Sequence, residues 1–504
     1  MNTTLTTIRP ELLTLLPAQF EAITPFLWVF GGTVLALLAC VLRIISPKWP
    51  VFLITVATAV AGIVASVAIL HIEPILLFNG MMAVDSFANF FNIVFLASAI
   101  LTIFASVRYL DNEGLQHPEY YVLVMFAALG MMLMASGLDL IVLFIALELM
   151  SLSVYVLVGF RRADRRSNEA AIKYFILGSA ASAVLLYGAA LLYGATATTN
   201  IREILAFVHS HQGNTGSLFT LGSWLVMIGF LFKVASVPFH MWMPDVYEGA
   251  PAPITGFMTT GLKAAAFAAF LRVFVSLGYG KELTTVVQSH IHDILWISAV
   301  LTMGVGNLVA LTQTNLKRML AYSSISHSGY LLVGLLSGAQ SDQGYGPVVM
   351  YLVAYAIMNL GAFVILAIIA QRGDAGMNLH DFSGLARRHP WLAFSMAVFL
   401  FSMAGVPPTA GFAAKYMLFY SAVQAHETVL VIISVLCSAI SVYYYLRVLV
   451  YMYMRDPIEN EKAPARRVSV LSACAVASMV ALTLQIGVLP ARLVAAAKKA
   501  VTSL

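Results

Sequence analysis

The chain has 504 residues, of which 61% are hydrophobic and only 10% are charged. Soluble proteins carry about 25% charged residues, so this composition excludes an ordinary soluble domain. The net charge of +5 comes from basic residues spread along the chain, which argues against a nucleic-acid-binding surface. Cys40, Cys437 and Cys474 lie far apart in apolar runs and form neither a disulfide framework nor a metal motif.

Apolar runs recur along the whole chain, and at roughly 18–25 residues each can cross a ~30 Å hydrocarbon core as a helix. Continuous runs exclude the strict alternation of a membrane β-barrel. The predicted fold class is therefore an all-α polytopic membrane protein with about 14 transmembrane helices. Residues 201–211 predict a short interfacial helix. The predicted spans are 24–43, 49–70, 84–107, 118–137, 139–160, 169–194, 217–242, 253–277, 290–312, 316–337, 345–370, 390–421, 428–453 and 468–489.

The basic residues outside the spans indicate an orientation. Most lie in loops that follow odd-numbered spans, such as Arg161 and Lys317. Fewer lie at the termini or in loops that follow even-numbered spans, such as Arg202 and Arg272. Because positive residues are retained on the cytoplasmic side, we expect both termini on the periplasmic or equivalent face.

Two pairs of segments reveal an internal repeat. SLSVYVLVG at 151–159 matches SHSGYLLVG at 326–334, and FLFKVASVPF at 230–239 matches FLFSMAGVPP at 399–408. The pairs are 175 and 169 residues apart, and they align Glu148 with Ser323 and Lys233 with Ser402. Since spans 5 and 7 align with spans 10 and 12, the sequence predicts an inverted five-helix repeat. The predicted organisation is 1–117 (helices 1–3), 118–280 (first half), 288–455 (second half) and 466–504 (helix 14).

Each matched FLF segment runs into proline in the middle of a span. Pro238 interrupts span 7, and Pro407 and Pro408 interrupt span 12. Proline removes a backbone donor and breaks a helix, and the freed groups are tolerated in a membrane only against protein or water. Paired broken helices in two halves of a transporter-like fold indicate an ion pathway.

Four charged residues lie deep within predicted spans: Glu148, Lys233, Lys263 and Lys415. A charge at the bilayer centre costs about 3 kcal/mol, so such residues normally face a partner or a wet cavity. A lysine held between burial and a nearby carboxylate can change its protonation state when that partner moves. We therefore expect these residues to relay protons.

Two histidines extend the predicted relay. His240 is seven residues after Lys233, a spacing that places both on one face of a continuous helix. His327 lies near the start of span 10 among four serines, which form a hydrophilic face. A supporting lysine, Lys173, lies in span 6.

Structural interpretations of the same residues remain open. In one alternative, the Glu148–Lys233 pair is purely structural and joins two helices. Lys173 can extend its ammonium to the membrane surface, and Arg447 fits a structural role at the end of a span. The sequence contains no Walker loop, dinucleotide fingerprint, CxxC or HExxH motif, so we expect no metal and no cofactor bound by this chain. The energy for transport must then come from an ion gradient or from partner subunits.

The chain resembles the antiporter-like membrane subunits of respiratory complex I, the proton-translocating NADH:quinone oxidoreductase. The resemblance covers nearly the whole chain and is strongest over KVASVPFHMWMPDVYEGAPAPITGF at 233–257. Its PDVYEGAPAP is similar to one branch of the complex I subunits and differs from the PDAHxEAPTP tendency of sodium/proton antiporter subunits. Lys415 fits the same branch.

The resemblance implies roles for residues of this chain. Glu148 matches a glutamate that pairs with the span-7 lysine, here Lys233; Lys263 matches the central lysine, and Lys415 the lysine on the exit side. Lys173 matches a further lysine, while His240 and His327 resemble positions of the hydrophilic axis.

The resemblance also implies partners and a location. FMN and iron–sulfur clusters are expected in partner subunits, and quinone elsewhere in the complex. The implied partners are the other membrane and peripheral subunits of complex I and the lipid bilayer, with no nucleic acid, and the implied location is a bacterial inner membrane. Two alternatives stay open: a sodium/proton antiporter-type subunit, and a structural membrane subunit of a related redox complex.

Overall fold

The computed structural model describes residues 17–42, 48–211, 215–276, 286–457 and 468–504, and most of them are helical. The first part of the chain contains α1 (Pro17–Leu42), α2 (Lys48–Ala68), β1 (Ile75–Leu77), β2 (Met82–Val84), α3 (Ser86–Glu113), α4 (Glu119–Ser136), α5 (Leu140–Val158), α6 (Arg165–Thr196), α7 (Ile201–Ser210), α8 (Gly216–Lys233), α9 (Met243–Gly249), α10 (Ala252–Phe257), the π-helix η2 (Met258–Leu262) and α11 (Lys263–Ser276).

The remainder contains a second series of helices and two short 3₁₀ turns. They are α12 (Val286–Thr312), α13 (Leu316–Ser337), α14 (Gly346–Ile369), η3 (Arg372–Asp374), η4 (Leu379–Phe382), α15 (Leu385–Arg388), α16 (Pro390–Ala404), α17 (Ala410–Gln424), α18 (Thr428–Met454), α19 (Val470–Val488) and α20 (Ala491–Val501).

The predicted spans agree with these helices. Thirteen described helices are long and apolar enough to cross a membrane, and the other predicted span, 390–421, consists of α16 followed by α17. The predicted interfacial helix is α7. The predicted boundaries at 280 and 466 lie outside the described residues. So do some basic residues used for the orientation: Arg9, Arg43, Lys281, Lys462, Arg466 and Arg467.

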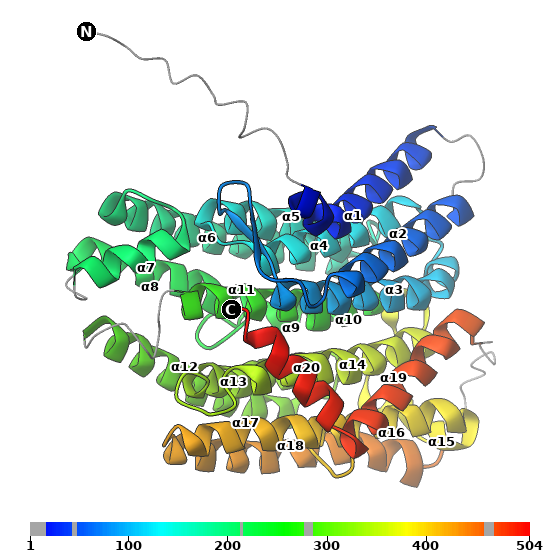
Figure 1. Cartoon of the computed structure of the whole chain (residues 1–504). Helices are drawn as coiled ribbons and strands as arrows, with labels where there is room; N and C mark the ends of the chain where they lie inside the picture. Colours follow the sequence, from blue (N-terminus) through cyan, green and yellow to red (C-terminus); the bar gives the residue numbers. More distant parts are fainter. Residues whose placement is uncertain (1–16, 43–47, 212–214, 277–285, 458–467) are drawn as a thin grey trace.

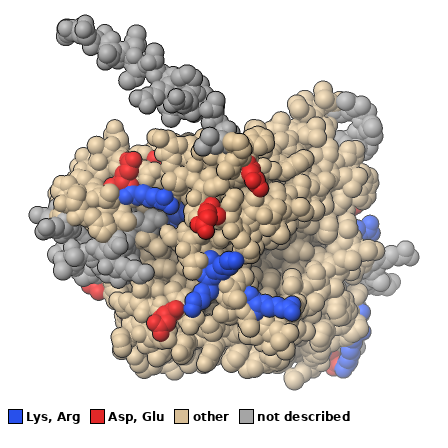
Figure 2. Space-filling view, viewed as in Figure 1, with Lys and Arg blue, Asp and Glu red and all other residues tan. Residues whose placement is uncertain are grey.

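The helices lie side by side in one bundle, and their connections gather at its two ends (Figure 1). Helix α7 lies at one end and α15 at the other. Charged side chains are sparse on the face drawn in Figure 2, as expected for a surface that meets lipid or other membrane subunits. The sequence did not predict the β1–β2 hairpin or α20, which packs against α14 and α3.

Arg272 is not a loop residue, contrary to the prediction. It lies in α11 with its side chain 2% exposed and forms a two-pronged ion pair with Asp85, with N–O distances of 2.9 Å. Asp85 is also the N-cap of α3. A buried cation of this kind fastens helices together and carries no information about orientation. The same correction applies to Lys317, which was also assigned to a loop but lies in α13 with its side chain 1% exposed.

The repeat is present in the structure, but its register differs by one residue from the sequence match. Asp139 caps α5 and Asn315 caps α13 through equivalent hydrogen bonds, and each forms a bridge to an asparagine, Asn200 or Asn378. These caps are 176 residues apart, so Glu148 corresponds to Ser324. The prediction of Ser323 is wrong. Apolar helices use few residue types, so identical residues can align by chance one position away, whereas the hydrogen bonds of the caps define where each helix begins.

The two broken helices have the same turn. The amide of Ser236 donates to Leu231 O and that of Val406 donates to Phe401 O, each at 3.0 Å. Ala235 and Gly405 adopt the left-handed conformation that ends many helices, with φ of 55° and 88°. These positions are 170 residues apart, so Lys233 corresponds to Met403 and not to Ser402.

Candidate functional site

The break between α8 and α9 exposes backbone groups that side chains of other helices satisfy. Ser328 of α13 donates to Val234 O at 2.6 Å. On α12, Thr302 accepts from Val237 N at 2.8 Å and Ser298 donates to Val237 O at 3.0 Å. Pro238 follows directly and is exposed at the surface of the chain. The predicted break is therefore confirmed, with its polar groups held by protein rather than lipid.

Lys233 is the last residue of α8, and its ammonium lies in the interior. Its Nζ donates to Ser151 Oγ of α5 at 3.2 Å, and the residue is 8% exposed. Glu148 lies one helical turn before Ser151 and interacts with Lys233 electrostatically, but the two form no ion pair within 4.0 Å among the described residues. Glu148 Oε1 is buried and has no hydrogen-bond partner among the residues that the structure describes.

The helical-face argument for His240 is wrong, because α8 ends at Lys233 and the chain turns before the histidine. His240 lies between α8 and α9 and is half-buried. Its Nδ1 atom is buried without a hydrogen-bond partner in the described part of the chain. The residue therefore lines the break but is not stacked above Lys233.

Lys263 follows directly after the π-helical turn η2, a type of irregularity that often marks functional sites. Its Nζ donates to Ser324 O at 2.6 Å and to Ser324 Oγ at 2.5 Å. The ammonium also lies 5.1 Å from the centre of the Tyr355 ring, within the range of a cation–π interaction. The sequence did not predict the π-turn, because π-helices leave no compositional signal.

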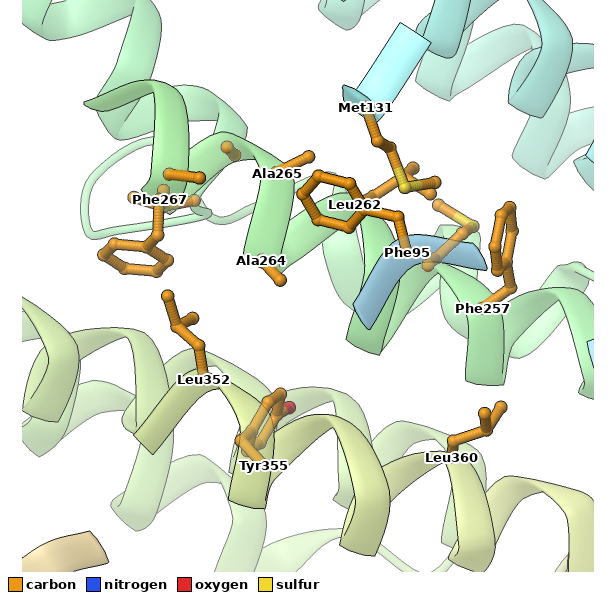
Figure 3. Packing of buried hydrophobic residues seen from close by; sticks show 14 of the residues in the cluster. Phe95, Met131, Phe257, Leu262, Ala264, Ala265, Phe267, Leu352, Tyr355 and Leu360 are labelled. Atoms are coloured by element: carbon orange, nitrogen blue, oxygen red, sulfur yellow. The ribbon is translucent and has the colours of Figure 1, made fainter. Parts of the chain in front are cut away.

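Apolar packing surrounds this lysine. Figure 3 shows Leu262, Ala264 and Phe267 between Met131 of α4 on one side and Leu352 and Tyr355 of α14 on the other. All these side chains are 6% exposed or less. A charge in such surroundings has few partners, so Ser324 and Tyr355 determine where the ammonium can lie.

His327 lies at the centre of a cluster of tyrosines. Its Nδ1 is 2.6 Å from the Tyr351 hydroxyl and its Nε2 is 3.3 Å from the Tyr445 hydroxyl. Its ring lies 4.9 Å from that of Tyr355 and 5.7 Å from that of Tyr330. The predicted serine face is also present, since Ser323 hydrogen-bonds to Tyr445.

Lys415 lies on α17 and binds the end of α16. Its Nζ donates to Met403 O at 2.9 Å, Ala404 O at 3.2 Å and Ser438 Oγ at 2.9 Å. The last carbonyls of a helix have no partner within the helix and carry partial negative charge, so an ammonium fits there. The ammonium is also 5.3 Å from the centre of the Tyr330 ring.

The buried lysines therefore form a row with polar groups between them. Ser328 joins Val234, the neighbour of Lys233, to Ser324, the partner of Lys263. The rings of Tyr355, His327 and Tyr330 then lead from Lys263 to Lys415. The hydroxyls, the imidazole and the lysines of the row can donate or accept protons, and the aromatic faces hold the ammonium groups between them, so the row is suited to proton transfer in steps.

Lys173 lies apart from this row, at the end of the bundle that carries α9. Its Nζ is 2.6 Å from Glu169 and 3.0 Å from Asp245, and its side chain is 42% exposed. Asp245 also accepts from Arg318 at 2.8 Å. Burial alone would raise the pKa of Asp245, but the hydrogen bonds from Lys173 and Arg318 outweigh it and lower that pKa below its usual range.

Sequence reasoning missed the neutral members of the row. Ser151 and Ser438 were not singled out, Ser324 was predicted only as part of the hydrophilic face around His327, and the tyrosines were interpreted as packing residues of an apolar span. The only available signal was the density of hydroxyl groups on spans 10, 11 and 13. Arg447, predicted to be structural, donates to the carbonyls of Leu311 and Gln313 at the end of α12. Within the described ranges, no group of three or more His, Cys, Asp and Glu residues could hold a metal ion.

Comparison with known proteins identifies the family. A family model described as NADH:quinone oxidoreductase/Mrp antiporter, TM, matches residues 137–441. This region contains both broken helices and all the buried lysines of the row. The chain belongs to this family of antiporter-like subunits and is a multi-pass membrane protein.

Relatives place the chain within that family. It is 47% identical over 401 residues to NADH-quinone oxidoreductase subunit N of Trichlorobacter lovleyi, covering 79% of this chain and 81% of the relative. It is 41% identical over 475 residues to subunit N of Myxococcus xanthus, covering 88% and 91%. The chain thus falls among the subunit N sequences, the branch indicated by PDVYEGAPAP and Lys415.

Solved structures agree with the fold. A chain of respiratory complex I from Thermus thermophilus matches with a TM-score of 0.78 and 32% identity, covering 94% of this chain and 98% of that one. A chain of the Mrp complex from Dietzia matches with a TM-score of 0.82 and 21% identity, covering 96% and 97%. At that identity, the second match supports the fold alone.

Proposed function

We propose that the chain is the proton-translocating membrane subunit N of an NADH:quinone oxidoreductase in a bacterial inner membrane, with both termini periplasmic. Electron transfer from NADH to quinone would occur in partner subunits that carry FMN and iron–sulfur clusters, and this chain would perform no redox chemistry. The observation that supports proton transfer most strongly is the series of polar and aromatic contacts that runs from the helix break beside Lys233 through Lys263 to Lys415.

In this proposal Lys233 controls one end of the row. Its ammonium rests on the neutral Ser151, while the unpartnered Glu148 oxygen lies one turn away on the same helix. A change in the field along the complex would draw the ammonium toward Glu148 or release it. Release makes Lys233 a better proton donor, since the nearby carboxylate no longer stabilises its charged form.

The remaining steps pass along the row to the opposite side. Lys263 receives a proton by way of the hydroxyls of Ser324 and Ser328, with water between them. His327 can accept at one ring nitrogen and donate from the other, which suits a residue between two lysines. Lys415 holds the last proton against the α16 carbonyls before it is released. The second half, 288–455, thus provides the outlet.

Replacing Lys233 with alanine tests this function. Proton pumping and NADH:quinone activity should both collapse in membrane vesicles when expressed per assembled complex, because a coupled pump cannot turn over without its relay. Lys48→Ala is a suitable control, because Lys48 forms an exposed ion pair with Asp111. Wild-type pumping by Lys233→Ala would leave Lys233 as a structural residue and contradict the proposal.

A further inference from the structure

Asp374 lies at the centre of a buried charge cluster that the relay does not use. It belongs to η3, in the connection after α14, and its side chain is 3% exposed. Its Oδ2 accepts from Lys317 Nζ at 3.0 Å and from Ala252 N at 3.1 Å, and lies 3.4 Å from Arg161 Nη1. Its Oδ1 accepts from the Tyr109 hydroxyl at 2.9 Å. One carboxylate therefore joins four separate elements.

The two cations of this cluster hold the end of α9. Arg161 donates to Gly249 O at 3.0 Å, and Lys317 donates to Glu248 O at 2.9 Å and Ala250 O at 2.6 Å. These carbonyls lie at the end of α9, where no amide of the same helix can donate to them. The two cations supply the missing hydrogen bonds. They belong to the PDVYEGAPAP segment, at 244–253, that sets this branch of the family apart.

The start of α9 is in turn fastened beside Lys233. Trp242, the N-cap of α9, donates from its indole Nε1 to Phe232 O at 3.2 Å. Its ring stacks on Tyr174 at 4.7 Å and on Phe232 at 5.7 Å. Phe232 directly precedes Lys233, so a shift of α9 changes the position of the residue that carries the ammonium.

Asp374 is also held in an unusual backbone conformation. Its φ is 53°, in the left-handed region that non-glycine residues seldom adopt, and it follows Gly373 with φ of 75°. The Gly373 amide donates to Glu113 at the end of α3, at 2.9 Å. Burial would raise the pKa of Asp374, but Lys317 and Arg161 outweigh it and hold that pKa below its usual range. The carboxylate is therefore charged at neutral pH.

We propose that Asp374 is a positioning residue for proton transfer, which fixes α9 through Arg161 and Lys317 and thereby sets the place of Lys233. Asp374 lies in the loop that follows α14, which belongs to the second half of the repeat. Through Arg161 and Lys317, this loop therefore holds α9, which belongs to the broken helix of the first half. The proposal rests on the proposed function, since it assigns Asp374 an effect on the same relay. Contacts that continue from one element to the next can carry such an effect.

Substitution of Asp374 tests the proposal in the assembled complex. Asp374→Asn keeps the size of the side chain but removes its charge, so Arg161 and Lys317 keep their carbonyl acceptors but lose the carboxylate that they share. Pumping per assembled complex should fall about tenfold, which is less than the roughly hundredfold that a 1 Å misplacement can cost. Asp374→Glu should restore much of it. Asp456→Asn is a matched control, because Asp456 forms an exposed ion pair with Arg387.

A structural role alone gives a different result. It would reduce the amount of assembled complex but leave pumping per complex unchanged in Asp374→Asn, and that result overturns the proposal. If Asp374→Asn does not assemble, Tyr109→Phe decides: reduced pumping per complex supports the proposal, and wild-type pumping overturns it. Loss of pumping in Lys233→Ala together with unchanged pumping in these variants would refute the role of Asp374 and leave the proposed function standing.

Discussion

The two broken helices share a turn but differ in what satisfies it. At the first break, the freed groups of Val234 and Val237 bind side chains of α12 and α13, from the other half of the repeat. At the second break, the partners are mostly local. Ser402 accepts from Gly411 N at 2.9 Å, and Lys415 binds the α16 carbonyls. The first break therefore depends on distant helices, and the second is largely self-contained.

The lysines follow the same division. Within the described part of the chain, Lys233 has a single hydrogen-bond partner, a neutral serine on another helix, and a glutamate oxygen without a partner lies nearby. Lys415 has three acceptors, two of them carbonyls of the helix that its own segment continues. We infer that Lys233 is free to change partner during turnover, while Lys415 is a fixed station. The same kind of helix break therefore lies beside a mobile lysine in the first half and beside a fixed lysine in the second half.

The largest expected difference is in stability. Lys415→Ala leaves two buried carbonyls without donors, at about 1–3 kcal/mol each, whereas Lys233→Ala leaves one serine hydroxyl. Both substitutions also remove the cost of burying an ammonium, and this gain in stability is the same in the two variants. In a thermal-shift assay of the purified complex, Lys415→Ala should lower the transition of this subunit further than Lys233→Ala does.

Equal transition temperatures in the two variants would contradict this expectation. They would mean that water reaches the α16 carbonyls and replaces the ammonium, and Lys415 would then be as free to move as Lys233.

A smaller difference is expected when the serine partners are removed. Ser151→Ala removes the one hydrogen-bond partner that Lys233 has among the described residues. Pumping per complex should therefore change about fivefold, the equivalent of roughly 1 kcal/mol for one hydrogen bond. Ser438→Ala leaves Lys415 with two carbonyl acceptors, so pumping should stay close to that of wild type. The same vesicle assay measures both. A larger effect of Ser438→Ala would reverse the roles that we assign to the two lysines.

Most of the fold could be predicted from the sequence, because membrane-spanning helices can be recognised from long runs of apolar residues. Long apolar runs gave most helix boundaries within a few residues, although α1 begins at Pro17 rather than 24 and α8 ends at Lys233 rather than 242. Pro238 and Pro407 indicated the two breaks. The register of the repeat was missed by one residue, because it depends on caps such as Asp139 and Asn315. Hydrogen bonds define those positions, whereas identical apolar letters do not.

The site was predictable only in its charged members. Lys233, Lys263 and Lys415 stand out because a charge in lipid is costly. Their partners are serines, tyrosines and backbone carbonyls, which occur throughout such a chain and acquire meaning only through distance. Arg272, assigned to a loop from its charge, is paired with Asp85 in the interior, because an arginine near a span end has the same sequence signal in either position.

The central claim is that the three lysines act as one relay with Lys263 in the middle. The most direct test is proton pumping per assembled complex in Lys263→Ala, Lys233→Ala and the double variant. Residues that act as a unit are strongly non-additive, so the account predicts that each single variant pumps as poorly as the double. Wild-type pumping by Lys263→Ala, with Lys233→Ala inactive, would show that protons bypass the centre of the row and would contradict the relay.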